Sequence, residues 1–351
     1  MKSHRRGLAA ALLVAVTTLA AACVPPTPAT PAATGRQQAA NWLAHQFDGS
    51  THLIPSAFVP GSSDVGGSAY SATSLVLAGW GDSTAANAVA ALAPNVDAFV
   101  KDSGGADLPG SLARLIIAVE STGGNPHAFG AFDLVARLEA TMQTTGPDAG
   151  RFGAQFAAYD GDFVQGLSLA ALSVVSPKPA SIDAGAGSVD ALPAVAWLRT
   201  QQCADGSWMY RADVSQPCAF DPATFAGPDT NSTALAILGL HAVGSTAPVD
   251  PMTWLTSIRD ADGGWSYDGS SFSVSDPDST GLVMGALRAL GTTPDAAAVT
   301  ELLSFQFGSS APAPQRGAFY YPFGTPTPNL LATNDAMLGL ADGVWPAVLA
   351  H

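Results

Sequence analysis

Two stretches of the chain share one pattern, in which a long apolar run of small residues stands between polar residues. Residues 229–248 (DTNSTALAILGLHAVGSTAP) and 276–294 (DPDSTGLVMGALRALGTTP) begin with Asp and with Ser or Thr, and they end with Gly and then Pro. Asp, Ser and Thr cap helix N-termini, Gly suits the position after a helix, and Pro opens the next helix. Each stretch therefore predicts a helix that is apolar all round and buried among its neighbours. Fainter copies stand at residues 68–81, 108–126, 162–179 and 333–346.

Helical stretches of a second kind, with one apolar and one polar face, alternate with these buried helices. Inner helices that touch neighbours on every side need Ala, Gly and Ser for close approach, whereas outer helices keep one wet face. Six hairpins of alternating character predict an all-α fold, a closed α/α toroid (an α6/α6 barrel) that forms one domain over residues 37–351. The amphipathic stretches are centred on Trp42-Leu43, Phe99-Val100, Leu134–Leu138, Trp197-Leu198, Trp254-Leu255 and Leu302-Leu303.

The end of one outer helix carries a motif that explains how the two layers join. In WLRTQQCADGSW (197–208), Trp197 belongs to the outer helix, and Gln202, Gly206 and Trp208 follow it. We expect Gln202 to bond the helix end or a neighbouring loop, Gly206 to adopt a positive φ, and Trp208 to stack over the helix terminus. A second copy (WLTSIRDADGGW) contributes Trp254, Gly263 and Trp265 and has Arg259 in the glutamine position, and Gln46 and Gln306 mark copies without the tryptophan.

The spacing Gln202-x-x-x-Gly206-x-Trp208 resembles the repeat of the prenyltransferase and squalene-cyclase superfamily of α/α toroids. That superfamily also includes transcobalamin-like cobalamin-binding domains and the thioester domains of complement. The resemblance extends over residues 37–351 and implies the toroid fold. It implies no single function, because the members include both enzymes and carriers.

The sequence does not contain the catalytic motifs of the enzymes in that superfamily. Protein prenyltransferases hold zinc with an Asp and a Cys two residues apart and a distant His, whereas Asp229 is followed at that spacing by Asn231. The sequence has no Asp-x-Asp-Asp run of a class II terpene cyclase and no Cys-x-x-Gln run of a thioester domain. We therefore predict no metal site and no cofactor, and we favour a protein without catalysis.

A ligand site is nevertheless predicted where the N-termini of the inner helices converge at one mouth of the toroid. Helix capping accounts for each polar residue there when it is taken alone. Together the residues supply hydrogen-bond acceptors around a ligand, and neighbouring carboxylates raise one another's pKa and furnish an acid–base pair. The residues are Asp229, Asn231, Asp276, Asp278, Asn334 and Asp335, of which Asp229, Asp278 and Asp335 are the catalytic candidates.

The longest interruption between an outer and an inner helix contains GAFYYPFGTPTPN (317–329). Long loops in compact domains often carry function. We expect Phe319, Tyr320 and Tyr321 to stack on a flat or sugar-like ligand at the mouth. Four residues near the ends of inner helices are predicted to belong to the core instead, namely Tyr70, Trp80, Phe163 and Gln165.

The N-terminus predicts export from the cell. A basic start and the apolar run 8–22 are typical of a signal peptide over residues 1–22, and the run is too short for a membrane span. The sequence LAAAC, which ends at Cys23, resembles a bacterial lipobox and predicts a lipidated cell-envelope protein. Cleavage by the ordinary signal peptidase after Ala22, giving a secreted protein, is the alternative. In the lipidated protein, residues 23–36 comprise the lipidated Cys23 and a Pro/Thr/Ala-rich tether between the membrane and the domain.

Charge and cysteine content narrow the partners. Asp and Glu number 28 against 14 Lys and Arg, and no basic cluster lies beyond the first six residues, which excludes nucleic acid as a partner. In an exported chain Cys203 and Cys218 are expected to form a disulfide that stabilises the fold by roughly 3 kcal/mol. The expected partners are a small-molecule ligand and, through the lipid alone, the membrane.

Three functional hypotheses follow from these observations. The favoured one is an exported, lipid-anchored protein that binds a small or hydrophobic ligand in the mouth without catalysis. The second is an extracytoplasmic enzyme of the terpene-cyclase or prenyltransferase kind, or one that acts on polysaccharide, with the mouth carboxylates as its acid and base. The third is an interaction scaffold that binds through its outer helices.

Lipidation gives the first testable prediction. Cells grown with radiolabelled lipid are expected to incorporate the label into this protein, because the thiol of Cys23 accepts the lipid. The substitution Cys23→Ala is expected to abolish the label, as read by autoradiography of the purified protein. A wild-type protein without label, with a mature N-terminus after Ala22, would instead support a secreted form.

Overall fold

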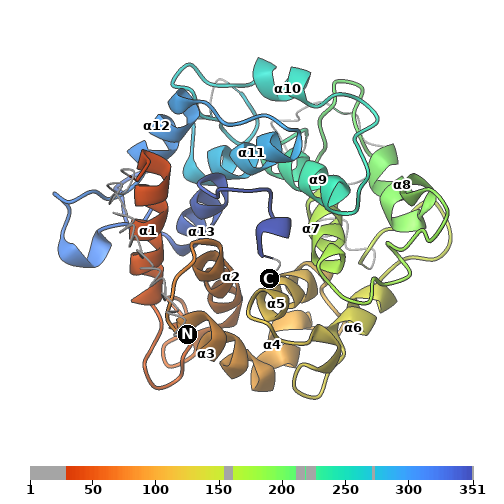
Figure 1. The fold of residues 1–351 in the computed structure, drawn as a ribbon, viewed down its shortest axis with the longest axis horizontal. Coiled ribbons are helices and arrows are strands. Elements are labelled where there is room, and N and C mark those ends of the chain that lie inside the picture. Colours follow the sequence, from red (N-terminus) through yellow and green to blue (C-terminus); the bar gives the residue numbers. More distant parts are fainter. Residues whose placement is uncertain (1–28, 154–160, 211–217, 219–226, 271–272, 350–351) are drawn as a thin grey trace, which may run out of the picture.

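The α/α toroid predicted from the sequence is the observed fold. The computed structural model describes residues 29–153, 161–210, 218, 227–270 and 273–349. Figure 1 shows an inner ring of helices around a central axis and shorter helices outside it. The inner ring consists of α2 (Val65–Leu77), α5 (Pro109–Ser121), α7 (Asp162–Ser173), α9 (Thr230–Ala242), α11 (Pro277–Ala289) and α13 (Leu330–Gly339).

Apart from α1, which has 14 residues, the outer layer is made of shorter and more irregular segments than the inner ring. Its α-helices are α1 (Pro31–Ala44), α3 (Thr84–Leu92), α4 (Val96–Val100), α6 (Leu134–Ala140), α8 (Pro193–Thr200), α10 (Met252–Ser257) and α12 (Ala296–Ser304). The 3₁₀ helices are η1 (Ala93–Asn95), η2 (Pro126–Ala128), η3 (Val189–Ala191), η4 (Ala313–Gln315) and η5 (Ala347–Leu349). Among the described residues, the only named strands are β1 (Ile54–Pro55) and β2 (Ser63–Asp64), which pair antiparallel just before α2.

The inner ring is closed by contact between its last and first helices. Each inner helix contacts the next, and α13 contacts α2. Glycine permits the closest approaches. A Cβ on Gly166 of α7 would lie 2.1 Å from the Leu235 carbonyl oxygen of α9, and one on Gly281 of α11 would lie 2.3 Å from the Asp335 carbonyl oxygen of α13. The small residues of the inner pattern are therefore needed where one helix backbone meets another.

One backbone hydrogen bond recurs where the chain enters an inner helix. Before five of the inner helices, an apolar residue donates its backbone N–H to the side chain of the fourth residue of the helix. Trp208 donates to Thr233 Oγ1 over 2.9 Å, and Trp265 donates to Thr280 Oγ1 over 3.0 Å. The indole N–H of Trp208 also donates to the Leu198 carbonyl oxygen of α8, 2.9 Å away. The other pairs are Ile54 with Ser68, Phe152 with Gln165, and Phe319 with Thr333.

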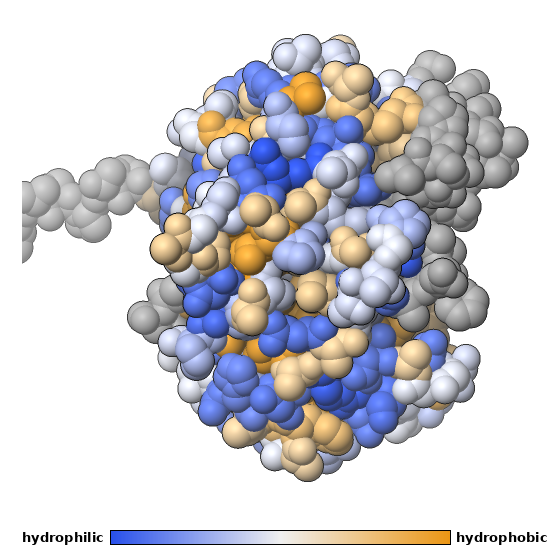
Figure 2. Space-filling view, turned by 90° about the vertical axis from the view of Figure 1, so that its right-hand side faces the viewer, coloured by the Kyte–Doolittle hydropathy of each residue, from blue (hydrophilic) through white to orange (hydrophobic). Residues whose placement is uncertain are grey.

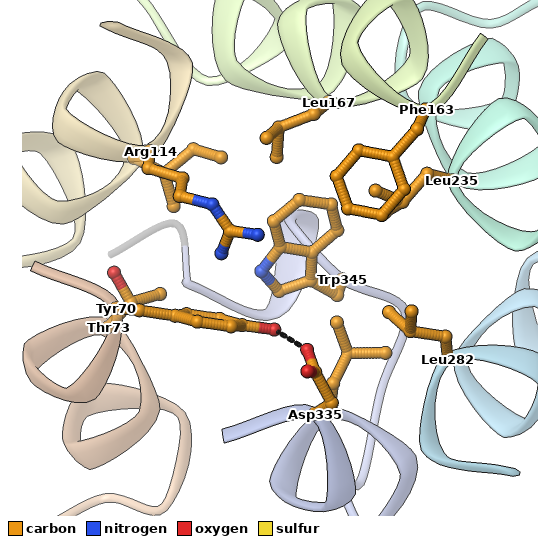
Figure 3. Close-up of a pocket in the computed structure, with 11 residues that line it drawn as sticks. Tyr70, Thr73, Arg114, Phe163, Leu167, Leu235, Leu282, Asp335 and Trp345 are labelled. Carbon is orange, nitrogen blue, oxygen red and sulfur yellow. Dashed lines mark hydrogen bonds between the residues drawn. The ribbon is translucent and has the colours of Figure 1, made fainter. Parts of the chain in front are cut away.

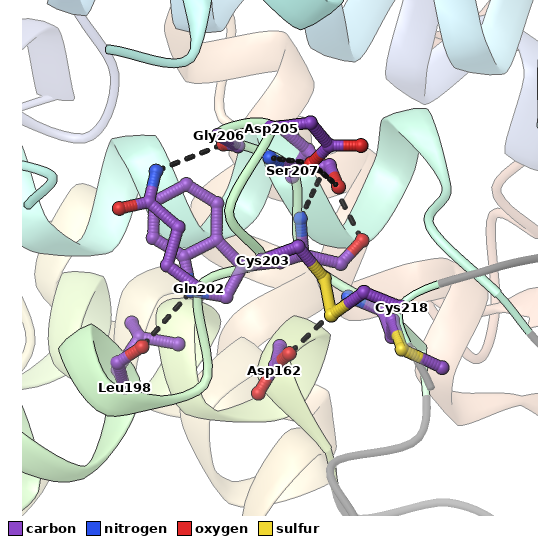
Figure 4. Close-up of a disulfide and its surroundings, with 11 residues drawn as sticks. Asp162, Leu198, Gln202, Cys203, Asp205, Gly206, Ser207 and Cys218 are labelled. Carbon is purple, nitrogen blue, oxygen red and sulfur yellow. Dashed lines mark hydrogen bonds between the residues drawn. A yellow bond between two sulfur atoms is a disulfide. The ribbon is translucent and has the colours of Figure 1, made fainter. Parts of the chain in front are cut away.

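The glutamine of the sequence motif links one outer segment to the next. Gln202 Nε2 donates to the carbonyl oxygens of Gly206 and Val249, each 2.8 Å away, and Gln202 Oε1 accepts from the Val249 N–H. Gly206 has a φ of 96°, and a Cβ there would lie 2.6 Å from the Asp250 carbonyl oxygen. Figure 4 shows this turn beside the disulfide between Cys203 and Cys218, whose Cα atoms are 5.8 Å apart, so the predicted pairing is confirmed.

Later copies of the motif repeat the link with other residues. Arg259 donates to the Gly263 carbonyl oxygen at 2.7 Å and pairs with Asp295, the N-cap of α12. Gln306 Nε2 donates over 2.8 Å to the Gly35 carbonyl oxygen of α1. This last bond joins the final outer helix to the first one and closes the outer layer.

The first helix begins earlier than the predicted domain boundary at residue 37. Helix α1 starts at Pro31, and the hydroxyl of Thr30 caps it by accepting from the Ala33 N–H over 3.2 Å. Proline is well suited to the first position of a helix, so the Pro/Thr/Ala-rich segment predicted as a tether over 23–36 enters the fold near its end. Arg36 fixes this helix by donating to the Leu340 carbonyl oxygen over 2.6 Å. The predicted signal peptide and Cys23 lie outside the described residues.

The segment that follows α13 turns back into the inner ring. Residues 340–349 run from the end of α13 toward the axis in Figure 1. The Trp345 side chain is only 4% exposed. It occupies the middle of the barrel, so the toroid is filled and is not an open channel.

The outer surface in view is polar for the most part. Figure 2, which shows the side carrying α6 and α8, has small apolar areas scattered among hydrophilic side chains. This mixture agrees with the wet faces that the sequence pattern predicts for outer helices. None of the described helices has both the length and the hydropathy that crossing a membrane requires.

Gly206 gives a prediction about stability. Gly206→Ala combines a positive φ with a clash against the Asp250 carbonyl oxygen, whereas Gly244→Ala has a positive φ of 81° and no neighbouring atom within 4 Å. Urea unfolding is expected to show a loss of about 1–2 kcal/mol for Gly244→Ala, from the backbone conformation alone. Gly206→Ala is expected to lose at least about 1 kcal/mol more. Equal losses would show that the turn has room to move.

Candidate functional site

The sixth residue of every inner helix faces the axis at the same level. These residues are Tyr70, Arg114, Leu167, Leu235, Leu282 and Asp335, and all six line one central cavity. The common level means that all inner helices run in one direction, with their N-termini at one mouth. Figure 3 shows Trp345 among these side chains, and only about 20 Å³ of free volume remains beside it. The interior below the mouth therefore has space for little more than water.

Two carboxyl groups of the predicted set come together at this mouth. Asp278 of α11 and Asp335 of α13 lie within hydrogen-bonding reach of each other. Asp335 is 3% exposed and accepts a hydrogen bond from the Tyr70 hydroxyl. Half-buried Asp278 accepts from Asn231 Nδ2 at 3.1 Å and from the Tyr321 hydroxyl at 3.5 Å. The two groups thus form a carboxyl pair held by amide and phenol donors.

The two carboxyl groups differ in how readily each one binds a proton. Burial, and then the charge of Asp335, raises the pKa of Asp278 well above its ordinary value. Burial also raises the pKa of Asp335, but the Tyr70 hydrogen bond and the Arg114 charge oppose that rise. Two carboxylates in contact do not both ionise readily, so they share a proton. Of the two groups, Asp278 therefore holds a proton more readily and Asp335 ionises more readily.

Two other predicted aspartates serve as helix caps. Asp229 Oδ1 accepts from the Ser232 N–H over 2.7 Å at the start of α9, and Asp276 Oδ1 accepts from the Ser279 N–H over 2.9 Å at the start of α11. Burial raises the pKa of each to about 7. Asn334 is buried and donates to Ser71 Oγ at 3.1 Å, which ties α13 to α2.

The three candidate aromatic residues have different locations. Phe319 is fully buried and occupies the tryptophan position of the corner motif. Tyr320 packs on Phe307, with ring centroids 5.0 Å apart, and donates its hydroxyl to the Ser304 carbonyl oxygen. Neither residue therefore faces the mouth. Tyr321 does reach the carboxyl pair through Asp278.

Two residues of the site, and one recurring sequence feature that indicates the mouth, were not predicted from the sequence. Tyr70 was expected in the core but donates to Asp335, and Arg114 lies over the Tyr70 ring, 4.4 Å from its centroid. A single arginine within an otherwise apolar inner helix was the available signal for Arg114. A tyrosine also follows two residues after three corner aromatics, in Trp208-x-Tyr210, Trp265-x-Tyr267 and Phe319-x-Tyr321. This recurring tyrosine, and not its neighbours, marks the mouth.

The described residues contain no group of three or more His, Cys, Asp or Glu side chains arranged to hold a metal ion. The chemistry that this arrangement offers is proton transfer. A carboxyl with a strongly raised pKa and a carboxyl that ionises more readily lie close together among phenols and an amide, at the positive ends of six helices.

Comparison with solved structures places the chain among α/α toroid proteins. It is similar to a variant of UGL with dGlcA-Glc-Rha-Glc (12% identity, 88% of this chain, 95% of that chain, TM-score 0.56). It is also similar to the type II terpene cyclase MstE from Scytonema with its product merosterolic acid A (15% identity, 88% and 96%, TM-score 0.54). A third similar structure is an inactive α-1,6-mannanase of Salegentibacter, with two aspartates replaced, in complex with α-1,6-mannotriose (11% identity, 88% and 98%, TM-score 0.54).

Similarity at these identities establishes the fold alone, although the named neighbours are enzymes. No protein-family model and no curated protein matches the sequence.

The buried caps predict how stability changes with pH. Because the pKa of Asp229 is raised, its contribution to stability is full below about pH 4 and is lost as the pH rises through about 7. Asp229→Asn keeps the cap and removes the cost of burying a charge. Urea unfolding is expected to show a gain of roughly 1–3 kcal/mol at pH 8 and little change at pH 4.

Asp295→Asn is the matched control for this prediction. Asp295 also caps a helix, but the Arg259 hydrogen bonds and the Ala298 N–H lower its pKa, so its contribution is present at neutral pH. Asp295→Asn is therefore expected to destabilise the protein at pH 8. Destabilisation by both substitutions at pH 8 would contradict the burial argument.

Proposed function

We propose that this protein is an enzyme that hydrolyses a glycosidic bond at the mouth of the toroid, with Asp278 as proton donor and Asp335 as proton acceptor. The observation that supports this proposal most strongly is the carboxyl pair, in which Tyr70 and Arg114 favour the ionised form of Asp335. Asp278 delivers its proton to the departing sugar oxygen. Asp335 takes a proton from the attacking water, and the pair is then restored by transfer between the two carboxyls.

The spacing of the pair determines how it acts. Glycosidases with two separate carboxyl roles hold them about 5–5.5 Å or about 6.5–9.5 Å apart. In this protein the two carboxyls are close enough for each to affect the proton of the other, which is closer than in either of these arrangements. We therefore propose that donor and acceptor act from the same side of the bond as one unit. A shared proton makes both roles available at neutral pH without a metal ion.

The lining of the mouth favours a saccharide over an isoprenoid. Asn231, Tyr267 and Tyr321 place polar groups beside flat aromatic surfaces, which is the combination that binds sugars. An isoprenoid chain would need an apolar chamber, and Trp345 fills the centre of this barrel. Two of the similar structures are named with bound oligosaccharides, which agrees with this choice. The predicted signal peptide supports a site of action outside the cytoplasm.

Substitution of the pair tests this function. Purified protein is incubated with oligosaccharides, including α-1,6-mannotriose and uronate-containing chains, and products are identified by mass spectrometry. Asp278→Asn and Asp335→Asn are each expected to lower turnover by about 10²–10⁴-fold, because each removes one half of the proton transfer. Asp295→Asn, on the outer layer, is expected to leave turnover unchanged.

A non-catalytic carrier would behave differently. Native mass spectrometry of the protein purified from its own envelope identifies any retained ligand. A ligand that leaves wild-type protein chemically unaltered, and that binds Asp278→Asn as well as wild type, would overturn the proposed hydrolysis. That result would restore the carrier hypothesis.

A further inference from the structure

Arg114 is the one cation among the residues that line the central cavity. It is half-buried on α5, at the same level as Asp335. Figure 3 shows its guanidinium group directed from α5 toward the axis, with the indole nitrogen of Trp345 on the side that faces it. Arginine and the indole N–H are hydrogen-bond donors with no acceptor of their own. The Arg114 guanidinium and the Trp345 indole N–H therefore lie on the same side of the central cavity, just below the mouth.

Among the arginines that the structure describes, Arg114 alone donates no hydrogen bond to another described residue. Within the described part of the chain, no carboxylate or carbonyl oxygen accepts a hydrogen bond from Arg114, whose recorded contact is with the Tyr70 ring. Leaving a partly buried charged donor without an acceptor is costly. The other arginines of the described ranges all have an acceptor: Arg36, Arg137, Arg151, Arg199 and Arg259 pair with aspartates, and Arg288 and Arg316 donate to carbonyl oxygens.

The free donors of Arg114 face the axis. Arg114 Cζ lies over the Tyr70 ring, 4.4 Å from its centroid, and in Figure 3 the guanidinium nitrogens are directed from α5 toward the axis. The edge of the guanidinium is the part of arginine that matches the two oxygens of a carboxylate. Asp335, the group of the pair that ionises more readily, is already bonded by the Tyr70 hydroxyl and does not occupy the Arg114 edge.

The charge of the mouth permits an anion there. Asp278 and Asp335 share a proton, and burial raises the pKa of Asp229 and Asp276 to about 7, so the four carboxyls carry fewer than four charges at neutral pH. The six helix N-termini and Arg114 add positive potential. An anionic group at Arg114 is thus attracted at close range despite the acidity of the whole chain.

We propose that Arg114 anchors a carboxylate of the substrate, so that the saccharide bound at the mouth is acidic and carries a uronic acid unit next to the bond that reacts. The assignment of a saccharide rests on the proposed function. The anchoring of a carboxylate does not, because it depends only on Arg114 and its lack of a hydrogen-bond acceptor among the described residues. Arg114 and Asp335 share one level, where the cavity has about 20 Å³ of free volume. The sugar ring therefore stays at the mouth, and only its carboxylate extends down to Arg114.

Simple sugars that differ in one group test this proposal. Binding of D-glucuronate, D-glucuronamide and D-glucose to the full chain is measured by ligand-observed NMR at pH 7 and low salt. Glucuronate is expected to bind at least about tenfold more tightly than the neutral amide. Arg114→Met is expected to remove this preference, and Arg114→Lys to restore part of it, because lysine keeps the charge and loses the bidentate edge. Circular dichroism establishes that each variant is folded.

Each alternative result has a definite meaning. Equal binding of glucuronate and glucuronamide by wild type would overturn the anchor, and so would a preference that survives in Arg114→Met. Tighter binding of glucose 6-phosphate or glucose 6-sulfate than of glucuronate would overturn the carboxylate assignment in favour of another oxyanion. Asp278→Asn separates the two proposals: it is expected to keep the preference for glucuronate while turnover is lost. Undiminished turnover in Asp278→Asn would reject the hydrolytic mechanism and leave the anchor standing.

Discussion

The arrangement of the site depends on one backbone hydrogen bond, from the residue at the corner to the fourth side chain of the inner helix that follows. The bond fixes both the height and the rotation of that helix. Successive helix residues are about 100° apart, so residues two and six each lie about 200° from residue four. When Thr280 faces the corner, Asp278 and Leu282 of α11 must face the axis. The same rule places Asn231 and Leu235 of α9 on the axis through Thr233.

This register gives the ring of sixth residues below the mouth a polar half and an apolar half. At the sixth position the consecutive helices α13, α2 and α5 carry Asp335, Tyr70 and Arg114. The next three helices, α7, α9 and α11, carry only leucine at that position. A sugar ring has one edge of hydroxyl groups and faces made of C–H groups, so it fits above a ring of side chains that is polar on one side and apolar on the other.

The sequence predicts the fold well because the information for it is local. Caps, apolar runs, glycine and the Trp208 corner each stand within one repeat, and the periodic pattern identifies which helices are inner. The mouth was predicted in part, since Asp278 and Asp335 stand near helix starts. Tyr70 was missed because its direction depends on the rotation of α2, which the bond between Ile54 and Ser68 helps to set. Arg114 was missed because its place in the site follows from its contact with the Tyr70 ring of another helix. Phe319 was assigned to the ligand because its role as the tryptophan of a corner requires the register of α13.

The same constraint leaves two positions of each inner helix in this chain open to change. The ring is held together by the corner bonds, the glycine contacts between helices and the links between outer segments. The side chains of residues two and six of each inner helix take no part in these three kinds of contact. Chemistry can therefore change at those positions without altering the ring. In this chain Trp345 adds a further restriction, because it fills the axis from the opposite end and confines any ligand to the mouth. That filling disfavours long apolar substrates, and it agrees with our proposal of a short polar unit at the carboxyl pair.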